Sequence, residues 1–156
     1  MSWCSPPRFL PDDAATTDLA RRVAPVLKAG DTLCLDGPLG AGKTHFARAA
    51  IRARLAQDED IPSPTFTLVQ TYEGRDGTEI WHCDLYRLSG PDEVLELGLE
   101  DAMEDAICLI EWPDRLGDMA PADALTLHLA MAGDGREAQF QSQNDTWKGR
   151  LADALG

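Results

Sequence analysis

The chain has 156 residues, 44% of them hydrophobic and 26% charged, which suits one globular domain spanning residues 1–156. Its net charge of −13 repels phosphodiester backbones and argues against direct binding of nucleic acid. No apolar run approaches the ~20 residues that span a bilayer, and the start lacks the features of a secretion signal, so we expect a cytoplasmic protein without a membrane partner.

The first half of the chain predicts a helix, a strand and a second helix. The first helix would begin with Thr17 as N-cap and run toward Lys28, with Pro25 kinking or shortening it. Residues 32–36 have the apolar character of a buried strand. The second helix would run from Lys43 to about Leu55.

The second half predicts two hairpins around a further strand. Two β-rich runs, 65–74 and 78–86, flank an Asp-Gly turn, and 124–143 repeats this pattern around Gly133-Asp134-Gly135. Between them, 106–112 is a short apolar strand, and Asn144 or Asp145 would begin a last helix. The predicted fold class is α/β, a P-loop NTPase-like sandwich with a mixed parallel/antiparallel central sheet.

The four cysteines show neither a zinc-ligand spacing nor a disulfide framework. Cys34 and Cys108 lie inside apolar runs, where a cysteine is usually a small core residue. We therefore predict no disulfide and no zinc site.

A glycine-rich segment between the strand at 32–36 and the following helix fits the pattern G-x-x-x-x-G-K-[ST]. Its glycines would let successive backbone N–H groups surround phosphate oxygens. Lys43 would reach the β- and γ-phosphates of a nucleotide, and the Thr44 hydroxyl would ligate Mg²⁺. His45 closes the segment and has no predicted role of its own. The predicted nucleotide-binding residues are Gly37, Pro38, Leu39, Gly40, Ala41, Gly42, Lys43, Thr44 and His45.

Two acids follow apolar strands and are candidates to act beside this loop. Glu111 ends the strand at 106–112, and Asp84 ends the run IWHCD. Either could merely cap the next turn. Together, beside a phosphate loop, they suggest that one carboxylate holds Mg²⁺ and the other orients water. Thr65 lies in a proline-stiffened loop and could be a nucleotide-sensing switch residue or a simple loop threonine.

These motifs, in this order, resemble the TsaE (YjeE) family, the small ATPase subunit of the bacterial machinery that makes threonylcarbamoyladenosine in tRNA. The resemblance rests on GPLGAGKT, SPTFTLVQTYEG, HCDLYRL, CLIEWPDRL and GREAQF, and covers most of residues 34–140. The resemblance implies that the chain uses ATP and Mg²⁺ as cofactors and hydrolyses ATP slowly. It also implies that the partner proteins are TsaD and TsaB, and that the chain contacts tRNA only indirectly, through the complex with them.

The same resemblance implies roles for individual residues. Thr44 and Glu111 would be the metal ligands, and Asp84 the acid needed for hydrolysis, with Lys43 on the phosphates. Thr65 would be the switch threonine near the γ-phosphate. Trp112 would link the site to the partner face or be a plain core residue, and the adenine contacts would fall near Asp13 and Arg136.

Three other functions remain open from the residues. A small-molecule kinase would need a basic lid, yet residues 89–113 contain no Lys or Arg. A GTPase would need a guanine-reading N-K-x-D string, which NDTWK does not supply. A non-enzymatic adaptor would use the same nucleotide-binding residues without turnover. The acids in 92–105 are a solvated helix face or a surface for a basic partner.

Overall fold

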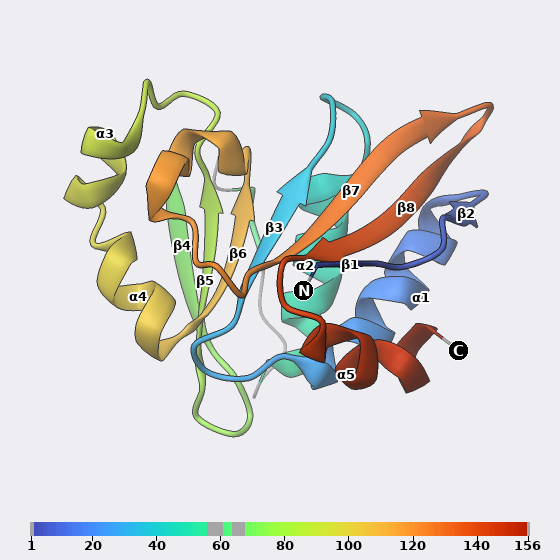
Figure 1. Cartoon of the computed structure of the whole chain (residues 1–156), viewed down its shortest axis with the longest axis horizontal. Coiled ribbons are helices and arrows are strands. Elements are labelled where there is room, and N and C mark those ends of the chain that lie inside the picture. Colours follow the sequence, from blue (N-terminus) through green and yellow to red (C-terminus); the bar gives the residue numbers. More distant parts are fainter. Residues whose placement is uncertain (1, 56–60, 64–67, 156) are drawn as a thin grey trace.

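A computed structural model of the chain describes residues 2–55, 61–63 and 68–155. Within these residues one sheet of eight strands runs in the order β1-β8-β7-β3-β6-β5-β4, and β2 pairs with β8 (Figure 1). The strands are β1 (Trp3–Cys4), β2 (Arg8–Leu10), β3 (Thr32–Asp36), β4 (Val69–Glu73), β5 (Glu79–Asp84), β6 (Ile107–Glu111), β7 (Leu125–Ala132) and β8 (Gly135–Ser142). Strands β5, β6, β3 and β7 are parallel to one another. The pairing is antiparallel between β4 and β5, and between β8 and each of β1, β2 and β7. The predicted α/β fold with a mixed sheet is confirmed.

Helices cover both faces of this sheet. They are α1 (Asp13–Val23), α2 (Lys43–Arg54), α3 (Pro91–Glu96), α4 (Leu99–Asp105) and α5 (Thr146–Leu155), with the 3₁₀-helices η1 (Ala24–Val26) and η2 (Pro113–Met119). None of the helices in the described part of the chain combines the length and the apolar character needed to cross a bilayer.

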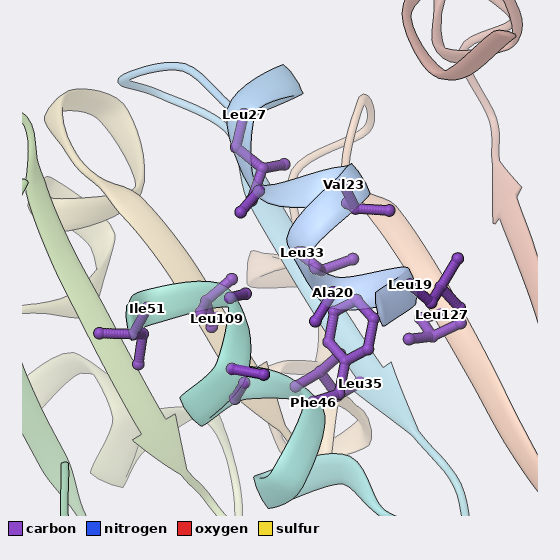
Figure 2. Close-up of a cluster of buried hydrophobic side chains, with 14 of the residues drawn as sticks. Leu19, Ala20, Val23, Leu27, Leu33, Leu35, Phe46, Ile51, Leu109 and Leu127 are labelled. Carbon is purple, nitrogen blue, oxygen red and sulfur yellow. The ribbon is translucent and has the colours of Figure 1, made fainter. Parts of the chain in front are cut away.

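The larger core lies between the sheet and helices α1, α2 and α5. Leu19 of α1 and Phe46 of α2 pack against Leu35 of β3 and Leu127 of β7 (Figure 2). Burying each such side chain contributes roughly 1.5–3 kcal/mol. This packing holds α2, and with it the glycine-rich loop before α2, against the carboxyl end of β3.

The smaller core lies on the opposite face, under α3, α4 and η2. Three of the four cysteines are buried here, so the prediction that Cys34 and Cys108 are core residues is confirmed, and Cys83 joins them. Burial raises the pKa of the Cys34 and Cys108 thiols to about 12. The structure shows all four cysteines as free thiols, as expected.

The N-terminal part differs from the prediction in two respects. The first helix begins at Asp13 rather than after Thr17, because Asp12 is the N-cap and accepts a hydrogen bond from Ala15 N at 2.9 Å. Asp is at least as good an N-cap as Thr, so the earlier start was available to the chain. Pro25 shortens the helix as expected, since α1 ends at Val23 and η1 follows. The strands β1 and β2 were not predicted.

Candidate functional site

The glycine-rich loop connects β3 to α2, as the sequence predicts. Gly40 and Gly42 have φ values of 80° and 100°, a left-handed conformation that favours glycine. Gly37 is required for another reason. A Cβ atom there would lie 2.3 Å from the carbonyl oxygen of Leu129 in β7, so any side chain would collide with a neighbouring strand. The loop conformation therefore depends on glycines at these three positions.

Lys43, the first residue of α2, is turned back toward its own loop. Its Nζ donates to the carbonyl oxygen of Gly37 and lies 3.4 Å from the ring centroid of Trp112. Burial lowers the pKa of Lys43, and nearby carboxylates, led by Glu111 and Asp36, partly oppose this effect. The ammonium group is thus held at the mouth of the loop by a carbonyl oxygen and an aromatic face.

Thr44, Glu111 and His82 form a continuous hydrogen-bonded row. The Thr44 hydroxyl donates to Glu111 Oε1 at 2.7 Å. His82 Nε2 lies 2.8 Å from Glu111 Oε2, and only 0% of His82 and 2% of Glu111 are exposed. A carboxylate so deeply buried needs partners on its oxygens. One partner comes from α2 and the other from β5, so the Glu111 side chain is fixed in a single orientation.

The pairing of β5 with β6 brings the two predicted acids to the same edge of the sheet. The strands are parallel, and Asp84 is directly opposite Glu111 in the register. Asp84 is 7% exposed, and its Oδ1 accepts a hydrogen bond from the Tyr86 backbone N–H at 3.1 Å. Asp84 therefore does cap the next turn, one of the two interpretations that the sequence allows. It does so beside the site, at the same level as Glu111.

Trp112, the residue after Glu111, has a left-handed backbone with φ of 61° and ψ of 57°. A bulky residue rarely takes this conformation, which usually costs about 1–2 kcal/mol. Here it turns the indole over Lys43, and the Tyr86 ring lies 4.8 Å away between centroids. Trp112 is thus part of the site wall.

The remaining predicted residues fall into two groups. His45 Nε2 lies 2.8 Å from Thr17 Oγ1 and 3.2 Å from the Asp13 carbonyl oxygen, and Arg136 donates to the Gly40 carbonyl oxygen at 2.9 Å. The structure thus brings Asp13 to the first turn of α2 and Arg136 to the loop, and their contact with adenine stays a prediction. Thr65 lies outside the described residues.

The role of His82 was missed from the sequence. The available signal was its place two residues before Asp84 on one strand, which puts both side chains on the same face of the sheet. Its partner, Glu111, is 29 residues away in the sequence, so only the pairing of β5 with β6 shows the contact.

Fold and site together define an α/β protein with a glycine-rich loop at a strand–helix junction and a hydrogen-bonded hydroxyl–carboxylate pair beside it. The comparison with known families gives the particular family. Residues 10–139 match the family described as threonylcarbamoyl adenosine biosynthesis protein TsaE, and the chain belongs to this family.

Individual relatives agree with this assignment. The tRNA threonylcarbamoyladenosine biosynthesis protein TsaE of Rickettsia bellii is 38% identical over 82% of this chain and 88% of its own length. The protein of the same name from Haemophilus influenzae is 31% identical over 90% of this chain and 92% of its own. The crystal structure of Bacillus subtilis YdiB superposes with a TM-score of 0.73 at 27% identity, covering 99% of this chain and 93% of that one. The chain thus belongs to a family of tRNA threonylcarbamoyladenosine biosynthesis, whose pathway implies partner proteins.

Proposed function

We propose that this chain is the Mg²⁺-dependent, ATP-binding and slowly ATP-hydrolysing subunit of a cytoplasmic system that attaches threonylcarbamoyl to tRNA adenosine, acting through TsaD and TsaB. The observation that carries the proposal is the contact between Thr44 and Glu111. It sits at the end of a glycine-rich loop, where a phosphate-loop nucleotide site needs its metal-ligating oxygens.

The residues at this position fit a magnesium ion. Mg²⁺ takes oxygen ligands and is usually held by one or two protein side chains together with phosphate oxygens and water. The Thr44 hydroxyl and the Glu111 carboxylate, 2.7 Å apart, supply such oxygens, and His82 holds the far carboxylate oxygen. When bound, the ion would neutralise phosphate charge and orient the β- and γ-phosphates. Thr44 and Glu111 are the residues that would hold it.

The other residues would act on the triphosphate and on water. The backbone N–H groups from Gly37 to Thr44 would surround the phosphates, and Lys43 would exchange the Gly37 carbonyl for phosphate oxygens. Asp84 would orient the water that attacks the γ-phosphorus, as the bond between that phosphorus and the ADP oxygen breaks. Thr65 would sense the γ-phosphate.

Hydrolysis by the isolated chain should be slow. An arginine that reaches the γ-phosphate contributes about 10³–10⁵ in rate. Two arginines, Arg87 and Arg115, lie in the motif region, and Arg115 is paired with Asp114 at 2.6 Å. Partner proteins would therefore be needed to complete the site.

The first experiment measures ATP binding by calorimetry with and without Mg²⁺. We expect Lys43→Ala to weaken ATP binding in both conditions and Glu111→Gln to remove the Mg²⁺-dependent part. Asp84→Asn should bind ATP normally and lose turnover. Asp134→Asn, which removes the same charge at an exposed hairpin position, is the control. No ATP binding by the wild-type chain, or equal behaviour of all four variants, would refute the proposal.

The second experiment is reconstitution of tRNA modification with TsaD and TsaB, with and without this chain. We expect modification to require the chain and to fail with Lys43→Ala. If Asp84→Asn abolished turnover but supported full modification, the chain would be an adaptor that uses nucleotide without needing hydrolysis.

A further inference from the structure

A second concave site lies between α1 and α2 and begins at His45, in the first turn of α2. It has a volume of about 400 Å³. Thr17 and Arg21 line it from α1, and His45, Arg48 and Arg52 line it from α2. The hydrogen bond between His45 and Thr17 closes the end nearest Thr44. The groove then follows α2 for two turns, because residues four apart lie on the same side of a helix.

Within the described part of the chain, no acidic side chain pairs with the arginines of this groove. Arg21, Arg48 and Arg52 are exposed, and the guanidinium group of none of them makes an ion pair or hydrogen bond with a described residue. By contrast Arg22, beside Arg21 in the sequence, pairs with Asp18 at 2.9 Å. The chain has 14 Lys and Arg residues against 27 Asp and Glu residues. Three guanidinium groups that have no partner among the described residues therefore form a local positive region in a negative molecule.

The lining indicates what kind of ligand fits. Among the described residues, Ala49 and Ala53 complete the lining beside the polar groups named above. Protein docking sites depend on large apolar or aromatic anchors and the pockets that receive them. The described lining of this groove contains no Phe, Tyr, Trp, Leu, Ile or Met side chain. An extended polyanion such as RNA would in addition meet the overall charge of −13. Arginine forks bind phosphate oxygens in pairs, and 400 Å³ is the size of a small-molecule site.

We propose that this groove binds a small, multiply charged phosphate compound, such as pyrophosphate or the di- or triphosphate group of a nucleotide, at a site separate from the glycine-rich loop. Arg48 and Arg52 would hold it from α2 and Arg21 from α1. The ligand would tie the two helices together. Because His45 directly follows Thr44 and bridges to Thr17, occupancy of the groove would be transmitted to the first turn of α2.

The test is calorimetric titration of pyrophosphate into the full-length Lys43→Ala variant, whose glycine-rich loop is impaired. We expect one saturable site that weakens in higher salt. Adding Arg48→Ser and Arg52→Ser should reduce the affinity at least about tenfold, since each removes charge-assisted hydrogen bonds. The matched control is Arg22→Ser, which removes one positive charge outside the groove and should leave the affinity unchanged.

The wild-type chain provides a second measurement should the Lys43 variant fail to fold. Wild type should bind two pyrophosphates, and Arg48→Ser/Arg52→Ser should bind one. Absence of pyrophosphate binding in folded Lys43→Ala, or equal weakening by Arg22→Ser, would overturn the groove proposal. Binding of a polyglutamate peptide with the same arginine dependence, without pyrophosphate binding, would also overturn it. None of these results would decide whether the glycine-rich loop binds ATP, because that proposal is tested by ATP binding to the wild-type chain.

Discussion

His82→Ala tests whether the buried row of hydrogen bonds holds the site together. The imidazole is fully buried on β5, and its Nε2 lies 2.8 Å from Glu111 Oε2. Alanine would leave that carboxylate oxygen inside the protein without its partner, next to a space of imidazole size. Thr44 would remain the only contact of Glu111 from this row.

The expected loss follows from burial. A buried carboxyl group that loses a hydrogen-bond partner costs about 1–3 kcal/mol or more, and the space left by the imidazole adds to this loss, so we expect about 3–5 kcal/mol in total. In a chain of this length 1 kcal/mol shifts the melting temperature by about 2–4 °C, so we expect His82→Ala to melt roughly 6–20 °C lower. His128 supplies the control, since its Nδ1 lies 2.9 Å from Asp36 Oδ2 while the two side chains are 41% and 53% exposed. An exposed pair is worth about 0–1 kcal/mol, so His128→Ala should shift the melting temperature by less than about 4 °C.

The assay is thermal unfolding of both variants followed by near- and far-UV circular dichroism. A double-mutant cycle with Glu111→Gln then isolates the pair, and we expect a coupling energy of about 0.5–3 kcal/mol between positions 82 and 111. Similar losses for His82→Ala and His128→Ala, or no coupling in the cycle, would refute the reasoning that burial makes this pair important.

Three further predictions concern the loop, the thiols and the first helix. Gly37→Ala should be more destabilising in urea denaturation than Gly40→Ala. A Cβ atom at position 37 would lie 2.3 Å from the carbonyl oxygen of Leu129, whereas a Cβ atom at position 40 would have no neighbour within 4 Å. The Gly40→Ala substitution therefore costs only the strain of the left-handed backbone, about 1–2 kcal/mol. At pH 8 a disulfide reagent should label Cys4 quickly and the three buried thiols only on unfolding. Burial raises the pKa of the Cys34 and Cys108 thiols from 9.0 to about 12. Their contribution to stability should therefore be complete below pH 9 and decline as the pH rises toward 12. The midpoints of urea denaturation between about pH 8 and 11 would detect this decline. Asp12→Ala should cost about 0.5–2 kcal/mol in the same denaturation assay, because the N-cap of α1 is lost.

Local patterns predicted the central elements well. The strand at 106–112 and the hairpin around Gly133-Asp134-Gly135 appear as β6 and the β7–β8 hairpin, since apolar runs and Gly-containing turns decide such elements over a few residues. The same local reasoning placed acids at the ends of two strands. The parallel register of β5 and β6 then brings Asp84 and Glu111 to the same edge of the sheet.

Features that depend on distant partners could not be predicted. The strands β1 and β2 have two and three residues, too few to show a period, and exist because β8 offers an edge. The left-handed backbone of Trp112 is unfavourable by itself and is accompanied by the contacts of its ring with Lys43 and Tyr86. The choice of Asp12 over Thr17 as N-cap likewise has no local signal strong enough to decide it.

Three groups that the proposed function needs have hydrogen-bond partners inside the protein. Lys43 is bonded to the Gly37 carbonyl, and Thr44 to Glu111, which His82 holds from the other side. A nucleotide that used Lys43 and Thr44 would therefore exchange existing hydrogen bonds for new ones, and only the difference would appear as affinity. Glu111 differs from these two, because its bond to His82 need not break when its other oxygen changes partner. The orientation of Glu111 should thus be the same with and without ligand, and the changes on binding should be confined to Lys43, Thr44 and the Trp112 ring that covers the lysine.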